Sequence, residues 1–112
     1  KAKEKGSVAS IISQNALGNR NSIEGRALDC FVRVYAAQTA NLALATMATG
    51  GIYIAGGIAP KVRGRLEERE FNEVFCENPK MSSLLEKFKL SMVVNPNPGL
   101  VGAMQRAKQA VV

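Results

Sequence analysis

The sequence predicts an α/β fold that is rich in helix and contains two short strands. Residues 52–55 form an apolar run without alternation, which is typical of a strand covered on both faces of its sheet. A second strand is expected at residues 90–94, after several short helical segments. Because two strands are too few for a sheet of ordinary size, we expect further strands from a longer polypeptide or from a partner.

Two helices are expected before the first strand. Residues 7–17 carry apolar side chains at helical spacing, and Gly18 is a natural stop. The next helix starts at Ile23, keeps an i, i+3/i+4 rhythm and loses most polar side chains after Phe31. Such a helix is expected to be buried between layers and to end at Gly50-Gly51.

Short helices are expected after the first strand, at residues 60–66, 71–75 and 81–88. Two prolines make residues 95–99 a stiff turn, and residues 100–111 have the pattern of a closing helix. The predicted order is therefore helix, long helix, strand, short helices, strand and helix.

Composition excludes several function classes. The 112 residues are one domain or a piece of one, and 46% are hydrophobic, which argues against disorder. The net charge of +6 comes partly from a charged start at residues 1–6, and acidic residues interrupt the later arginine cluster. Without a continuous basic face or many aromatics, we expect no nucleic-acid partner. No apolar run approaches the roughly 20 residues of a membrane span, so no membrane partner is expected.

Few side chains in the chain can perform chemistry. His is absent, and Asp29 is the sole Asp. Cys30 and Cys76 lie far apart and outside any metal-binding spacing, so they are expected to be free, buried and inert thiols. The chain shows no signal peptide and does not begin with Met, so it reads as part of a longer polypeptide. We therefore expect neither catalytic nor metal-binding residues.

The strongest functional signal follows the first strand. Gly56 and Gly57 end that strand, and Pro60 suits the first turn of a helix. Such a turn brings bare backbone and helix N–H groups close to a phosphorylated ligand, although paired glycines also occur for geometric reasons alone. The predicted nucleotide-binding residues are therefore Gly56, Gly57, Ile58 and, more weakly, Lys61.

Two polar residues have a purely structural interpretation as well as a functional one. Lys61 either adds charge near phosphates or belongs to a solvated helix face. Asn41 either touches the nucleotide or is a buried amide with satisfied hydrogen bonds.

Two separated motifs carry a family resemblance. Residues 41–61 read NLALATMATGGIYIAGGIAPK, and residues 93–103 read VVNPNPGLVGA. Both motifs, with the connecting segments FNEVF and KMSSLL between them, resemble bacterial-type glucokinase from about residue 11 onward. Ala40 departs from the pattern, because the family often has Gly at this position.

The resemblance implies a fold and an activity. Residues 1–112 would be a single partial domain, the C-terminal segment of the large lobe of an actin-like ATPase (ribonuclease H-like) fold. The full protein would be a cytoplasmic, glycolytic and homodimeric kinase that transfers the γ-phosphoryl of Mg·ATP to the 6-hydroxyl of glucose. Gly56-Gly57 would be its adenosine motif, and residues 100–110 would form a helix at the interdomain hinge.

The resemblance also implies what this chain lacks. The family's phosphate-binding Asp-x-Gly-Gly-Thr loop, its catalytic Asp and its sugar-binding Glu and His residues precede the matched region. ATP and Mg²⁺ would be bound mainly by that upstream part, so this segment is expected to be inactive alone. One alternative is a fragment of a non-catalytic sugar-sensing regulator on the same fold. Another is a free-standing nucleotide-binding module, for which two strands make a poor sheet.

Overall fold

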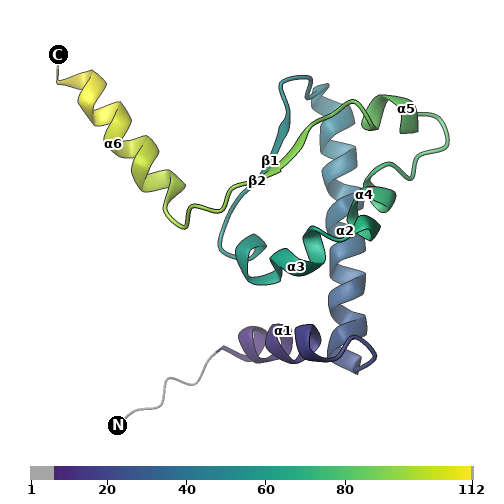
Figure 1. Ribbon diagram of the computed structural model, residues 1–112. Coiled ribbons are helices and arrows are strands. Elements are labelled where there is room, and N and C mark those ends of the chain that lie inside the picture. The colour runs from purple at the N-terminus through teal and green to yellow at the C-terminus, as the bar shows by residue number, and fades with distance from the viewer. Residues whose placement is uncertain (1–6, 112) are drawn as a thin grey trace, which may run out of the picture.

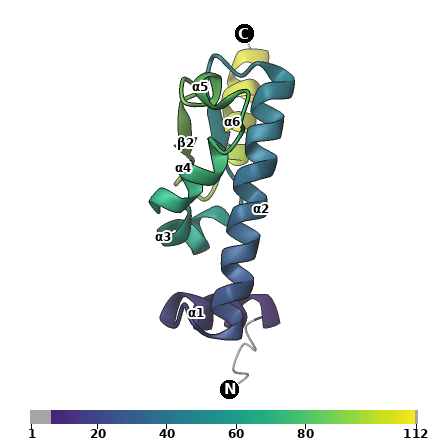
Figure 2. The same cartoon turned by 90° about the vertical axis from the view of Figure 1, so that its right-hand side faces the viewer.

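The structure, a computed structural model, describes residues 7–111 as a flat molecule of 52 × 51 × 17 Å. Its radius of gyration is 17.3 Å, whereas a compact chain of this length would have about 13 Å. The described part of the chain is therefore broad in one view (Figure 1) and thin in the view turned by 90° (Figure 2). Much of its apolar surface is exposed. The predicted charged start at residues 1–6 lies outside the described residues.

Helix α2 (Ile23–Thr46) is the longest element, and most other elements pack on it. The Ser22 side chain caps its first turn by accepting a hydrogen bond from the Gly25 N–H at 3.0 Å. The helix ends at Met47, whose φ of 46° is left-handed. The predicted end at Gly50-Gly51 is therefore wrong by one turn, because Met47 itself adopts the conformation that usually selects glycine.

One face of α2 is buried. The buried residues recur every three or four positions, as on one side of a helix: Gly25, Leu28, Val32, Ala36, Thr39, Ala40 and Ala43. On the opposite side, Val34 and Leu42 are 63% and 59% exposed. The expectation of a helix buried between layers is thus wrong for the described residues, which cover α2 from one side only (Figure 2).

Helix α1 (Val8–Gly18) crosses one end of α2. A short turn joins the two helices, and its backbone passes very close to Gly25. A Cβ added to Gly25 would lie 2.3 Å from the Arg20 carbonyl oxygen and 2.5 Å from that of Asn19. Glycine is therefore required here by close approach.

The two strands, β1 (Ile52–Ile54) and β2 (Leu90–Met92), pair in parallel, with Ile52 opposite Leu90. This confirms a helix-rich α/β fold with two strands, although each strand is shorter than expected. Ile54 is buried, but Tyr53 on the other face is 68% exposed. The expectation that β1 is covered on both faces is therefore wrong within the described chain.

Four short helices connect the strands and lie on one side of α2 (Figure 2). They are η1 (Ala59–Val62), α3 (Arg63–Leu66), α4 (Arg69–Phe75) and α5 (Ser82–Leu85). The helix predicted at residues 60–66 is thus a 3₁₀ turn followed by one α-helical turn, and only half of the helix predicted at residues 81–88 forms. Their buried side chains, such as Val62, Phe75 and Leu85, complete a core against α2.

Helix α6 (Pro98–Ala110) projects away from the other helices (Figure 1). Every residue of α6 is exposed, including the apolar Leu100, Val101 and Met104. None of the helices within residues 7–111 has the length and hydropathy of a membrane span.

The close approach at Gly25 gives a stability prediction. In the full-length protein, Gly25→Ala should lower the free energy of unfolding by about 1–3 kcal/mol, because the added methyl group overlaps two carbonyl oxygens. The midpoint of urea unfolding measures the change. Gly64→Ala is the matched control, since its Cβ meets no described atom within 4 Å, and better helix propensity should add up to about 1 kcal/mol. Equal stabilisation by both changes would contradict the packing described for Gly25.

Candidate functional site

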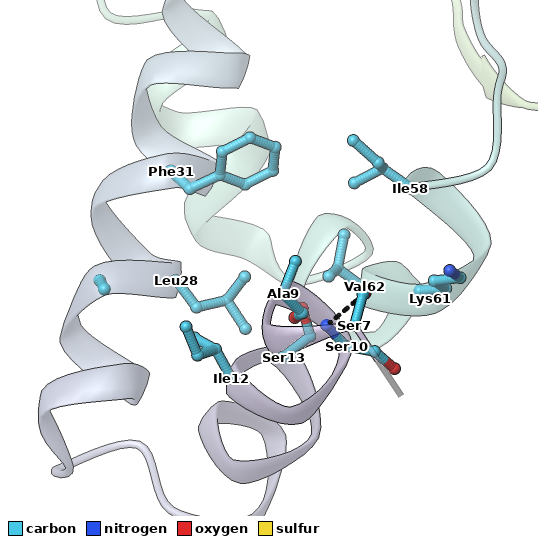
Figure 3. Close-up of a pocket in the computed structure, with 11 residues that line it drawn as sticks. Ser7, Ala9, Ser10, Ile12, Ser13, Leu28, Phe31, Ile58, Lys61 and Val62 are labelled. Carbon is cyan, nitrogen blue, oxygen red and sulfur yellow. Dashed lines mark hydrogen bonds between the residues drawn. The ribbon is translucent and has the colours of Figure 1, made fainter. Parts of the chain in front are cut away.

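A cavity of about 350 Å³ lies where α1, α2 and η1 meet (Figure 3). This volume falls within the range of small-molecule sites. Eleven residues line the cavity: Ser7, Ala9, Ser10, Ile12, Ser13, Ala27, Leu28, Phe31, Ile58, Lys61 and Val62. They come from three segments far apart in the sequence, so tertiary packing creates the cavity.

Apolar side chains form the walls on two sides. Leu28 and Phe31 come from one side of α2, while Ile58 and Val62 face them from the start and the end of η1 (Figure 3). Val62 is buried, but Phe31 and Ile58 keep 42% and 59% of their surface exposed. These two side chains therefore offer apolar surface on which a ring could lie.

Helix α1 contributes hydroxyl groups. Ser7, Ser10 and Ser13 follow one another at intervals of three residues, which places them on one side of α1. The Ser7 hydroxyl oxygen accepts a hydrogen bond from the Ser10 N–H at 3.3 Å, and the Ser13 hydroxyl donates one to the Ala9 carbonyl at 2.8 Å. Each of these hydroxyl groups still has hydrogen-bonding capacity for a ligand.

Lys61 is the single charged residue among the described residues that line the cavity. Its exposed ammonium group supplies positive charge, and the lining residues that the structure describes include no carboxylate. The combination of apolar walls, hydroxyl groups and one cation suits a flat, partly apolar ligand that carries negative charge.

The structure brings together only part of the predicted site. Ile58 and Lys61 line the cavity, whereas Gly56 and Gly57 lie in the exposed loop that leads to it. Gly56 has a φ of +109°, which disfavours a side chain. Gly57 has no such φ, and a Cβ there would meet no described atom within 4 Å. Within the described chain, a side chain is therefore disfavoured at Gly56 but not at Gly57.

Two further expectations need correction. The segment after the glycines is a four-residue 3₁₀ turn that begins at Ala59 and has Pro60 as its second residue, so it is too short to act as an anion-binding helix terminus. Asn41 is exposed, so it is no buried amide. It lies ten residues after Phe31 along α2, about 15 Å from the cavity along the helix, and is not part of its lining.

Sequence reasoning missed the walls from α1 and α2. The spacing of Ser7, Ser10 and Ser13 was a usable signal, because it places three hydroxyl groups on one helix face. For Leu28 and Phe31 the sequence offers no such signal, since their pattern is that of ordinary core residues.

A cluster of ion pairs lies beside the cavity, at the contact between α2 and α3. Arg65 is its centre: its side chain is only 9% exposed and pairs with Asp29 of α2. Arg65 also donates to both carboxylate oxygens of Glu68, at 3.0 and 3.1 Å. Arg20, in the turn before α2, pairs with Asp29 at 3.4 Å and with Glu68 at 3.1 Å. Asp29 is thus engaged by two arginines.

The cysteines lie outside the cavity lining and are both free. Cys30 is exposed, so the prediction that it is buried is wrong. Cys76 is half-buried, and burial, together with the nearby Glu86 carboxylate, raises the pKa of its thiol. A thiol with a raised pKa is a poor nucleophile, in keeping with an inert Cys76.

Metal binding has little support in residues 7–111. No group of three or more Cys, Asp or Glu side chains in this part of the chain could hold a metal ion. Mg²⁺ prefers carboxylate and phosphate oxygens, and the cavity lining supplies no carboxylate. The residues present therefore do not fit a magnesium site.

Comparisons with known proteins agree on one family. The family model of Glucokinase matches residues 1–110. Glucokinase of Synechocystis is 37% identical over 103 residues, which are 92% of this chain and 29% of that protein. Glucokinase of Nostoc punctiforme is 38% identical over 92 residues, which are 82% of this chain and 27% of that protein.

The chain thus spans less than a third of the length of these relatives. No solved structure matches it. The resemblance drawn from residues 41–61 and 93–103 is confirmed by a match that extends over nearly the whole sequence. This chain belongs to the glucokinase family.

Proposed function

We propose that this chain is the C-terminal portion of a kinase that phosphorylates glucose at its 6-hydroxyl with Mg·ATP. In this proposal the cavity between α1, α2 and η1 holds the adenosine end of ATP, and the Gly56-Gly57 loop lies against the ribose and phosphates. The observation that carries the proposal is that Ile58 and Lys61, which follow the paired glycines, line the cavity of about 350 Å³.

The lining matches the chemistry of adenosine. The base is flat and largely apolar on its faces, so it can lie on Phe31 and Ile58, which are half-exposed in the cavity. The hydroxyls of Ser7, Ser10 and Ser13 can exchange hydrogen bonds with the polar edge of the base or with the ribose. Lys61 supplies the positive charge that phosphates require.

The loop explains how phosphates could approach. Because a Cβ at Gly57 would point into space free of described atoms, bare backbone is presented there to a ligand. A requirement for glycine at this position would then come from the nucleotide and not from the fold.

The relatives named above carry the name glucokinase, which favours a kinase over a sugar-sensing regulator. Phosphoryl transfer needs a group that accepts the hydroxyl proton and groups that neutralise the phosphates. The cavity lining offers Lys61 and no carboxylate, so we assign the proton acceptor to an upstream Asp. We assign Mg²⁺ no ligand within residues 7–111.

Helix α6 would carry part of the hinge between two lobes. Its fully exposed surface includes Leu100, Val101 and Met104, and burial of such side chains is worth about 1.5–3 kcal/mol each. In this proposal the rest of an actin-like kinase polypeptide covers this helix, together with the exposed side of α2.

The first test concerns Gly57. In the full-length protein, Gly57→Val should raise the KM for ATP by about tenfold or more, because the side chain would fill the space assigned to the nucleotide. The KM for glucose should change little. Steady-state kinetics with each substrate varied in turn separates the two effects.

Gly64→Val is the matched control for Gly57→Val. Gly64 also has open space at its Cβ but lies outside the cavity lining, so both KM values should stay near those of the unmodified enzyme. An unchanged KM for ATP in Gly57→Val would remove this loop from the nucleotide site.

The second test uses residues 1–112 alone. The isolated chain should show no glucose-dependent consumption of ATP, because the described cavity lacks a proton acceptor. It should also bind a hydrophobic dye, since side chains such as Val34, Leu42 and Leu100 are exposed. Robust turnover by the purified chain would refute the proposal that the catalytic groups lie upstream. A monomer that unfolds cooperatively and binds no dye would indicate an independent domain.

A further inference from the structure

We propose that Arg65 and Asp29 are positioning residues for the nucleotide cavity, and that their buried ion pair sets the distance between its two apolar walls. This inference rests on the proposed function. It concerns residues that neither line the cavity nor belong to the glycine motif, and it assigns them an effect on ATP affinity.

The first step is the burial of Arg65. An arginine that is nine-tenths buried is costly unless its charge is paired. Here the guanidinium pairs with Asp29 of α2 and with Glu68, which follows α3. Glu68, in the same segment as Arg65, fixes the direction of the guanidinium, and Asp29 attaches it to α2. The two contacts together restrain α3 against α2 in orientation as well as distance.

The second step is the path from Arg65 to the cavity. Helix α3 continues directly from η1, so the position of Arg65 determines that of Val62 and Lys61 one turn earlier. On the other side, Asp29 stands between Leu28 and Phe31 on α2, both of which line the cavity. The ion pair therefore joins the two segments that carry the facing walls.

Two other ion pairs near Arg65 each join residues of a single segment. Arg63–Glu67 and Arg69–Glu73 are exposed i, i+4 pairs within their own segments. Such pairs add little to stability and fix no distance between elements. Arg65–Asp29 differs because it bridges two elements through a buried arginine, whereas the arginines of the other bridging pairs, Arg20 and Arg33, are 52% exposed.

The experiment measures kinetics of the full-length enzyme with Arg65→Met, Asp29→Asn and the two changes combined. Loss of the pair should raise the KM for ATP about tenfold, because a small displacement of one wall weakens contacts with the base. The KM for glucose should stay within about twofold. The KM for ATP of the combined variant should not exceed that of the single variant with the higher KM, because both changes remove the same restraint.

Two variants control the interpretation. Arg69→Met removes a cation that is 90% exposed and should leave both KM values unchanged. Arg65→Lys keeps the charge but loses the two-sided geometry, so its KM for ATP should lie between those of the unmodified enzyme and Arg65→Met. Should Arg65→Met fail to fold, Asp29→Asn and Arg65→Lys still test the proposal.

Two outcomes would overturn the proposal. One is a lower melting temperature with an unchanged KM for ATP, which would make the pair merely structural. The other is an equal rise in both KM values, which would indicate general loosening. Gly57→Val distinguishes failure of the positioning role from failure of the nucleotide site. If only Gly57→Val raises the KM for ATP, the nucleotide site is supported and the positioning role of Arg65 and Asp29 is refuted.

Discussion

The buried face of α2 is the constraint on which the rest of this structure depends. Its buried positions are small or medium in size, from Gly25 at one end to Ala43 at the other. Small side chains let the other elements approach closely, and α1, α3, α4 and α5 all pack on α2. At Gly25 the approach is so close that even a methyl group would overlap two carbonyl oxygens. The positions of the short helices therefore follow from the surface of one long helix.

The cavity is a consequence of that packing. Helix α1 packs on α2 and also contacts η1, and these three segments do not fill the space between them. Leu28 thus belongs to both the core and the cavity, whereas Phe31 lines the cavity and remains exposed. The Arg65–Asp29 pair joins α3 to α2, and the restraint proposed for it rests on a guanidinium that is largely shielded from water. Stability and ligand binding would in this way depend on the same contact.

The order of elements could be predicted because its signals are local. Apolar spacing identified both long helices, and the paired glycines marked the end of β1. The exposure of Val34 and Tyr53 could not be predicted, since an apolar helix or strand acquires two covered faces only when other elements lie on both sides. The helix end at Met47 was missed because a left-handed methionine has no signal in the sequence.

Two residues of the cavity lining were named from the sequence for a similar reason, and their binding role stays a prediction. Ile58 and Lys61 follow a recognisable glycine pair in sequence, so local reasoning reached them. Ser10 and Phe31 lie about 30 to 50 residues earlier in the chain and join the cavity only through tertiary packing. The role proposed for Arg65 could not be predicted either, because in the sequence it is one of several arginines and glutamates in a mixed charge cluster.

The central claim is that the cavity between α1, α2 and η1 holds the base of ATP. Photolabelling of the full-length enzyme with 8-azido-ATP, followed by peptide mapping, tests it most directly, because the reactive group is attached to the base itself. Label is expected in peptides containing residues 7–13, 27–31 or 58–62, and excess ATP should prevent its incorporation. ATP-protected label confined to other parts of the protein would contradict the account.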